Sequence, residues 1–488
     1  MIDIKAKKHD RFTVEFKLGY NVNQNIVQSD FIVNTWIFVP HSLDVNPSTY
    51  SKERFYRDIL SHIRLITPVF LLNEIVEGDA VPLAYLENSF KKLVAEPNRH
   101  NKWEYEYHIK MFASIFKSSL RNQIYYIVKP LVEEERNHLV KKIILDVKLI
   151  LERYRNLAKI LNVPTVTNEL FSYYQFGDEF ISNIMQRQLF RLLNTLRDMF
   201  PELYNIYKHD IVSLLDNEII YRKSKGYPVV DKESTNKNRN LIFRSGALKK
   251  YIESELFLNA NKKRDGVLIE QIYYSLAAGV SMIFATAIAF SFQREYGNFT
   301  IPLFVALVVS YMLKDRIKDL LRYYYAHKRK NKYFDNKTII GINEKVIGMS
   351  REGFDFINES NVPKEIITLR DRTTLLEAEN RNSEEKIILF RKIVQISRDE
   401  LNANSEYPVS GVNDILRFNL SSFLHKMDDP TTPLYVTSDN GEDYEEIQGI
   451  KIYYLNFLMQ LKSSDSEEFK RYRIVFNRSG IKEIEELK

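Results

Sequence analysis

The stretch Gln271–Leu313 reads QIYYSLAAGVSMIFATAIAFSFQREYGNFTIPLFVALVVSYML, and the rest of the chain is interpreted around it. Gln271–Gln293 contains 23 residues without a charge, and Tyr296–Leu313 adds 18 more. A helix needs about 20 apolar residues to cross a hydrocarbon layer of about 30 Å. We therefore expect a two-helix transmembrane hairpin over residues 268–313, with its turn at Gln293–Thr300. A buried hairpin of a soluble protein is the alternative, but soluble helices seldom lack a polar face over this length.

Basic residues gather at both outer ends of the hairpin. Lys262, Lys263 and Arg264 precede it, and the residues predicted to contact the membrane surface follow it: Lys314, Arg316, Lys318, Arg322, Lys328, Arg329 and Lys330. Because basic residues near membrane helices favour the cytoplasmic side, two spans with both termini cytoplasmic, in the cell (inner) membrane, are expected. The same residues could bind anionic lipids, at about 1 kcal/mol each, or serve insertion alone.

Small residues recur at every fourth position of the first apolar segment. They are Ala277, Ser281, Ala285 and Ala289. Small side chains at this spacing let helices approach closely in lipid. Two interpretations stay open, namely packing within the hairpin and contact between protomers of a homo-oligomer.

The remainder of the sequence predicts a membrane-anchored α+β protein, with a mainly helical N-terminal domain (a bundle) and a mainly antiparallel β C-terminal domain. Amphipathic periodicity with prolines at the joints predicts the bundle, and β-branched and aromatic runs predict the strands. The expected divisions are an N-terminal α/β segment (1–97), the bundle (98–225), a linker and lead-in helix (226–267), the hairpin (268–313), a basic juxtamembrane helix (314–335) and a β-rich cytoplasmic domain (336–488).

Composition narrows the functional classes. The chain has no cysteine, which excludes disulfides, thiolate metal sites and cysteine nucleophiles. Its net charge of +6 equals the excess within Lys314–Lys332, which holds eight basic and two acidic residues. A general basic surface is not required to explain the charge, and no nucleic-acid partner is expected.

Catalytic motifs are scarce. Glycine-rich phosphate loops and metalloprotease motifs are absent, so neither a cofactor nor a metal is expected. Glu135 and His138 form one ExxH motif where a di-iron bundle needs two. The Arg57 and His62 spacing resembles that of HEPN ribonucleases, but it occurs here as often as chance predicts. An acidic cluster, Asp439, Glu442, Asp443, Glu445 and Glu446, is typical of a solvated hairpin tip.

We therefore expect an integral membrane protein that acts as a scaffold, sensor or effector through protein contacts. Its partners would be the lipid bilayer and either another protein or further copies of itself. Two alternatives stay open, namely a membrane-tethered hydrolase or nuclease without a recognisable motif, and an oligomeric membrane-perturbing effector. The sequence does not decide whether the chain is an enzyme.

Overall fold

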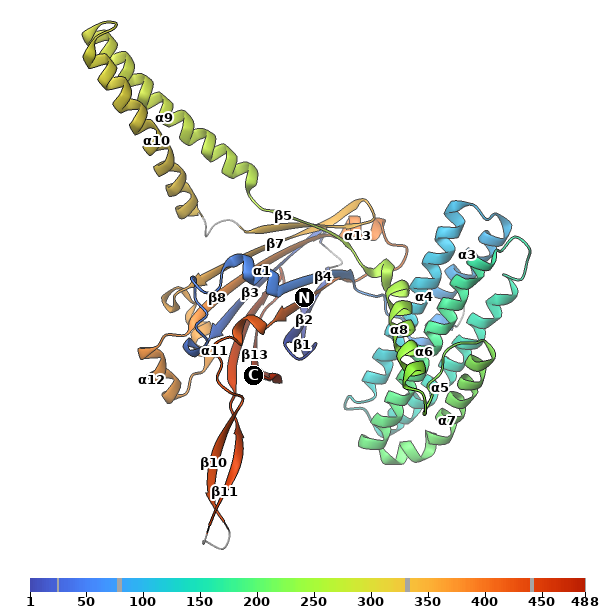
Figure 1. Cartoon of the computed structure of the whole chain (residues 1–488). Helices are drawn as coiled ribbons and strands as arrows, with labels where there is room; N and C mark the ends of the chain where they lie inside the picture. Colours follow the sequence, from blue (N-terminus) through green and yellow to red (C-terminus); the bar gives the residue numbers. More distant parts are fainter. Residues whose placement is uncertain (24–25, 77–80, 330–333, 439–442, 488) are drawn as a thin grey trace. The chain divides into compact units, whose positions relative to one another are not determined.

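The computed structural model describes residues 1–488 except 24–25, 77–80, 330–333, 439–442 and 488 (Figure 1). The chain divides into two compact units. The first combines Met1–Ile63, Asn259–Asn404 and Gly411–Lys488, and the second combines Arg64–Leu258 with Ser405–Ser410. We call them the sheet unit and the helical unit. Neither is one continuous stretch, whereas every predicted division of the chain was continuous.

The sheet unit is built on an eight-stranded antiparallel sheet with the order β14-β13-β12-β3-β8-β7-β6-β5. Its strands are β3 (Gln28–Val39), β5 (Asn259–Arg264), β6 (Asn336–Ile342), β7 (Lys345–Ile357), β8 (Lys386–Ser397), β12 (Tyr453–Lys462), β13 (Glu467–Asn477) and β14 (Gly480–Leu487). The N-terminal strand β3 lies between β12 and β8, so residues distant in sequence form the centre of the sheet.

A second sheet packs on one face of the first. Its order is β1-β2-β9-β4, with β1 (Ile2–Lys8), β2 (Thr13–Asn21), β4 (Ile59–Leu65) and β9 (Gly411–Asn419). Aromatic rings fill the space between the sheets. Phe16 of β2 lies 5.3 Å from Phe457 of β12, and Phe418 of β9 lies 5.8 Å from the same ring (centroid distances).

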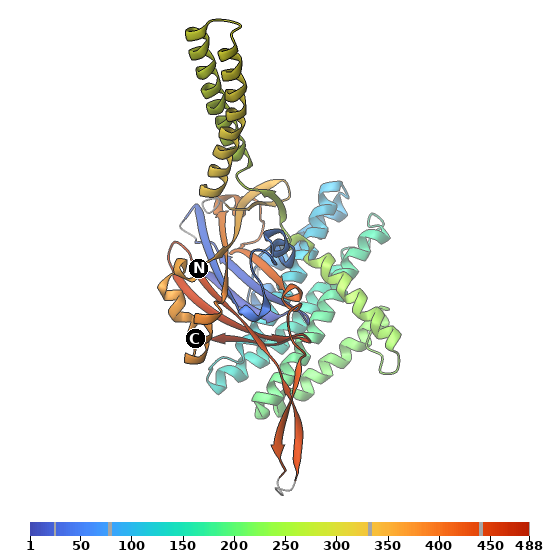
Figure 2. The ribbon, with the colours of Figure 1, turned by 60° about the vertical axis from the view of Figure 1, so that its left-hand side comes forward.

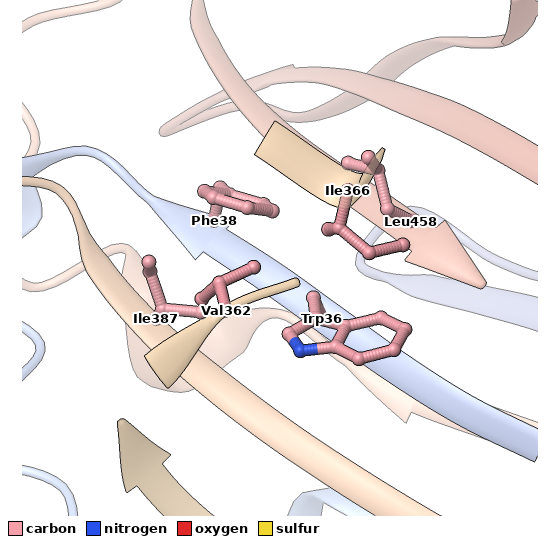
Figure 3. Packing of buried hydrophobic residues seen from close by; sticks show 6 residues of the cluster. All are labelled: Trp36, Phe38, Val362, Ile366, Ile387 and Leu458. Carbon is pink, nitrogen blue, oxygen red and sulfur yellow. The ribbon is translucent and has the colours of Figure 1, made fainter. Parts of the chain in front are cut away.

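The opposite face of the large sheet carries a separate hydrophobic cluster (Figure 3). Alternate residues of a strand point to opposite faces, which places Trp36 and Phe38 on this side while Ile37 faces the small sheet. Ile366 of the short helix α11 (Lys364–Arg370) covers Trp36 and Leu458. The short helices α1 (Lys52–Asp58), α12 (Thr374–Asn382) and α13 (Arg398–Ala403) complete the unit together with the elements described next.

Two long helices are inserted between β5 and β6. They are α9 (Val267–Tyr296) and α10 (Ile301–Arg329), which lie side by side in Figures 1 and 2. Further along the chain, β10 (Thr431–Thr437) and β11 (Tyr444–Ile450) form a separate two-stranded antiparallel ribbon.

The helical unit contains the predicted N-terminal helices. They are α2 (Leu72–Val76), α3 (Val81–Ala95), α4 (Arg99–Tyr126), α5 (Glu133–Asn156), α6 (Asn168–Met199), α7 (Pro201–Ser224) and α8 (Thr235–Ile252). Polar side chains begin several of them, because a side-chain oxygen satisfies a free backbone N–H of the first turn. Asn98 caps α4 in this way, and Thr167 caps α6. Pro201 occupies the first turn of α7, where its missing N–H costs nothing.

The predicted fold class is confirmed in its coarse form. The chain is mixed, with helices in its N-terminal half and an antiparallel sheet that holds most of its C-terminal strands. Within the predicted N-terminal α/β segment, α1 is followed directly by strand β4, which joins the small sheet beside β9. The lead-in to the hairpin likewise ends in a strand, β5, and not in a helix.

The predicted pair of transmembrane spans is not supported. Among the residues that the structure describes, α9 is the one helix long and apolar enough to cross a membrane. Gly297–Thr300 lie outside both helices, so the uncharged part of α10 is Ile301–Leu313, which is 13 residues and not 18. At 1.5 Å per residue this part is about 20 Å long.

The division into two units predicts how fragments behave. Residues 64–258, expressed alone, should fold, because the fragment contains every helix from α2 to α8. Residues 1–258 should be less soluble, because β2 and β3 then lack their partners β9, β8 and β12. Far-UV circular dichroism, thermal melts and sedimentation of the two fragments test this prediction. A disordered 64–258 fragment would contradict it.

Candidate functional site

The base of the α9–α10 hairpin is held by backbone pairing. The strands that lead into and out of the hairpin, β5 and β6, are neighbours, with Arg264 opposite Asn336. One step beyond, the Asp265 N–H donates a hydrogen bond of 3.0 Å to the Asp335 carbonyl oxygen. The two ends of the hairpin therefore start from adjacent positions at the edge of the large sheet.

The Asp335 carboxylate connects this base to the body of the sheet unit. It accepts hydrogen bonds from the Tyr56 hydroxyl (2.9 Å) and the Phe354 N–H (2.8 Å). It also forms an ion pair with Lys52, which comes from α1 like Tyr56. Because one side chain binds a helix and a strand at once, it fixes the start of β6.

A network of buried charges lies next to this base, between the two sheets. Lys392 of β8 is directly opposite Glu352 of β7, and its Nζ lies 2.8 Å from a Glu352 carboxylate oxygen. The same ammonium group pairs with Asp414 of the small sheet. The side chains of Lys392 and Asp414 are each only 1% exposed, so water does not screen this contact.

Two further residues complete the network. Lys262 of β5 reaches the second oxygen of Glu352 at 2.8 Å, and the Ser61 hydroxyl donates to Asp414 at 2.6 Å. Lys262 also lies 4.8 Å from the ring centre of Tyr56, the residue that holds Asp335. The contacts thus run without interruption from the base of the hairpin into the space between the sheets.

The network balances two cations against two carboxylates. Burial raises the pKa of Glu352, but the charges of Lys392 and Lys262 outweigh burial and lower this pKa to about 2. Burial lowers the pKa of Lys392, but Asp414 and Glu352 raise it above its ordinary value. Lys392 is therefore protonated at neutral pH, which makes it a poor nucleophile or base. The arrangement fits positioning of the hairpin base, not catalysis.

The helical unit has its own buried polar centre at His108 of α4. Its Nδ1 lies 2.8 Å from the Tyr407 hydroxyl, and its Nε2 lies 3.2 Å from a carboxylate oxygen of Glu406. Burial lowers the pKa of His108 to about 4, against the opposite effect of Glu104. The neutral ring therefore binds the segment Ser405–Ser410 into the helical unit at neutral pH.

The predicted membrane residues lie on the hairpin. Ala277 and Ser281 are buried in α9, as are Ala306 and Ser310 in α10, while Ala285 and Ala289 are half-buried. Lys314, Arg316, Lys318 and Arg322 belong to the same helix as the apolar part of α10. The side chains of Lys328 and Arg329, and the whole of Lys330, lie outside the described residues. Contact of these residues with lipid remains a prediction, as does contact between protomers.

The other candidate residues do not assemble into a site. Arg57 and His62 are exposed on different elements, α1 and β4. Glu135 and His138 are exposed beside a shallow, mostly apolar cavity of about 490 Å³. No group of three metal-ligating side chains occurs among the described residues. Part of the acidic cluster, residues 439–442, is not described, and the rest belongs to the β10–β11 ribbon or its turn.

Sequence reasoning missed the charge network. One signal was present in β8, where Ile388, Phe390, Val394 and Ile396 share a face with Lys392. A lysine at one inward position of an otherwise apolar face indicates a buried partner. The identity of that partner depends on which strands pair, and the sequence did not supply the pairing.

Comparisons with known proteins give no further information. No protein-family model, no curated protein sequence and no solved structure matches the chain.

Removal of the central cation should destabilise the sheet unit. Lys392→Met leaves Glu352 and Asp414 buried without their shared partner, which should cost about 3–5 kcal/mol. Lys262→Met, at a half-exposed lysine, should cost about 1 kcal/mol or less. Guanidinium unfolding of the full chain in detergent, followed by the fluorescence of buried Trp36 in a Trp103→Phe background, measures both values. Equal costs for the two variants would contradict the network.

The stabilising effect of Glu352 should depend on pH. Its pKa is depressed in the folded state, so its contribution is present above its ordinary pKa of 4.5 and is lost as pH falls toward about 2. This interval corresponds to roughly 3 kcal/mol. The difference in unfolding free energy between the wild type and Glu352→Gln should therefore shrink from pH 6 to pH 3. A difference that stays constant over this range would argue against the charge interaction.

Proposed function

We propose that this chain is a membrane-anchored scaffold that acts through protein contacts, with the α9–α10 hairpin as its anchor. The proposal rests on the exposed apolar surface of α9. Its most apolar window is only 11% buried within the structure, whereas the core helix of a soluble protein would be mostly covered. Large side chains such as Leu268, Ile283 and Phe290 are about 70–80% exposed. Such a surface needs an apolar environment, and a bilayer provides one.

The dimensions of α9 support a full crossing. The 23 uncharged residues Gln271–Gln293 measure about 35 Å as a helix, which exceeds a hydrocarbon layer of about 30 Å. The polar residues Arg294, Glu295 and Asn298 follow at the far end, where headgroups and water would receive them.

Because the apolar part of α10 is shorter than that of α9, charged residues of α10 would lie close to the hydrocarbon layer where this helix crosses back. Arg322 lies over the ring of Tyr274 at 5.0 Å, so the charged part of α10 lies beside the N-terminal part of α9. Lys314 and Arg316 come about 20 Å from the turn and would reach the near headgroups by extending their long side chains. We propose that these basic residues meet anionic lipid there.

Orientation follows from the base of the hairpin. The pairing of β5 with β6 keeps both ends of the hairpin adjacent, so both leave the membrane on the same side. Basic residues flank both ends, and such flanks favour the cytoplasmic side. We therefore propose an inner-membrane protein with both termini in the cytoplasm.

Two features support action through contacts. The buried network holds its lysine protonated and thus suits positioning better than catalysis. The β10–β11 ribbon offers exposed apolar side chains to a partner, including Leu434, Tyr435 and Ile447.

Vesicle flotation tests the anchor. The full chain, reconstituted into liposomes, should float with lipid at both low and high salt, because insertion is hydrophobic. In a second variant the hairpin is deleted, and an Asn-Gly turn joins Asp265 directly to Asp335. This variant should stay folded, since β5 and β6 already pair there. It should remain in the soluble fraction. A full chain that stays soluble without detergent or lipid would contradict the proposal.

A single substitution provides a finer control. Ile283→Lys places a charge on an exposed position near the middle of α9 and should cost about 3 kcal/mol of insertion free energy. Leu60→Lys, at an exposed leucine of β4, should leave flotation unchanged. Because the chain has no cysteine, Asn298→Cys gives a unique label at the hairpin turn. In intact cells an impermeant thiol reagent should reach it.

A further inference from the structure

The β10–β11 ribbon, which we call the arm, carries more exposed apolar surface than a free ribbon can maintain. Every residue of β10 is exposed, and in β11 only Gly449 is partly covered. Among the described residues, its two strands pair only with each other. An isolated two-stranded ribbon is marginally stable in water. An arm of this kind is therefore expected to gain its stability from a partner.

The register of the arm defines its two faces. Cross-strand pairs share a face, and Tyr435 is opposite Glu446 while Thr437 is opposite Tyr444. The rings of Tyr435 and Tyr444 lie 5.8 Å apart, centre to centre. Ile450 belongs to the same face, because its partner Thr431 is an even number of residues from Tyr435. This aromatic face has the composition that is enriched at protein interfaces.

The acidic charge of the arm indicates which kind of surface it can bind. Residues 431–450 contain five acidic residues and no basic one. Two arms placed face to face would therefore repel each other. A suitable surface is basic, contains exposed apolar side chains, and extends for about 24 Å, the length of seven strand residues.

Helix α8 of the same chain has these properties. Residues 235–252 contain five basic residues and no acidic one. Lys237 and Arg244 form ion pairs with Asp231 and Glu179, and the other three basic residues are exposed. Arg239, Phe243, Gly246 and Lys250 follow at spacings of four, three and four, so they form one stripe, and all four are exposed. Phe243 is 80% exposed. The helix has 18 residues and is about 27 Å long, which matches the arm.

We propose that the aromatic face of the arm docks on the stripe of α8 in a second copy of this chain. Glu446 then faces Lys250 at one end of the stripe, and Phe243 packs against Tyr435 and Tyr444. The contact is heterologous, since the two copies use different surfaces, so it builds rings or rows of protomers. The inference rests on the proposed scaffold function and identifies the protein contact as self-assembly.

Charge reversal tests the contact in the full chain, reconstituted in detergent at 0.15 M salt and measured by mass photometry over a concentration series. The wild type should associate. Glu446→Lys and Lys250→Glu should each weaken association by about tenfold or more, because each places like charges together. An equal mixture of the two variants should recover association, because each retains the surface that complements the other. Glu445→Lys makes the same charge change on the opposite face of the arm and serves as the matched control.

The outcomes separate this inference from the anchor. Each variant should float with vesicles as the wild type does, so that a loss of association with unchanged flotation isolates the arm contact. Failure of the full chain to float would refute the anchor, whatever its oligomeric state. A monomeric wild type at micromolar concentration would overturn the docking inference, as would Glu446→Lys that associates normally or a mixture without recovery.

Discussion

The position of β3 is the constraint on which the sheet unit depends. This strand pairs with β8 over its whole length and with β12 over Ile32–Phe38. It is covered on both faces, by the small sheet and by the cluster around Trp36. A register shift of one residue would exchange Trp36 and Ile37 between two different cores, so the pairing is strongly specified. The C-terminal strands cannot form this sheet without the first 63 residues.

Two insertions interrupt the sheet unit. The helical unit occupies most of the connection between β4 and β5, and the α9–α10 hairpin occupies the connection between β5 and β6. The helical unit connects the small sheet to the large sheet, whereas the hairpin leaves and re-enters the edge of the large sheet. For the hairpin, the charges of Lys262, Glu352 and Lys392 lie next to the point of departure. The hairpin and the sheet are thereby joined through a short base of paired strands.

The sequence predicted the helices and strands better than it predicted which of them pack together. The helix over Gln271–Gln293 needs no tertiary information for its prediction, because a long uncharged run is a local property of the sequence. The same holds for the amphipathic helices around α4 and α6. The second apolar run was overestimated, since Gly297–Thr300 count as uncharged residues but belong to the turn. The periodicity that predicts a helix is a local property of the sequence. The residue at which a helix ends depends on which groups hydrogen-bond to its terminal backbone N–H and C=O groups, and the sequence does not show them.

The candidate site shows the same division. The basic residues after Leu313 and the small residues of α9 were visible as patterns in the chain. The joining of Lys392 to Asp414 was not, because it requires β8 and β9 to belong to opposing sheets. The acidic cluster lies partly outside the described residues, and exposed tyrosines stand on the strands beside it. From the sequence alone these tyrosines would be assigned to a hydrophobic core, but in the structure they are exposed.

The central position of the N-terminal strand β3 also affects the order in which the sheet can form during protein synthesis. A ribosome adds about 5–20 residues per second, so β3 is complete about 20 to 80 seconds before β12 emerges. During that interval the hairpin has already left the ribosome, and a membrane-inserted hairpin would hold the nascent chain at the bilayer. The waiting strands β2 and β3 would then be confined to a layer near the membrane surface, where early insertion keeps them close to the partners still being made.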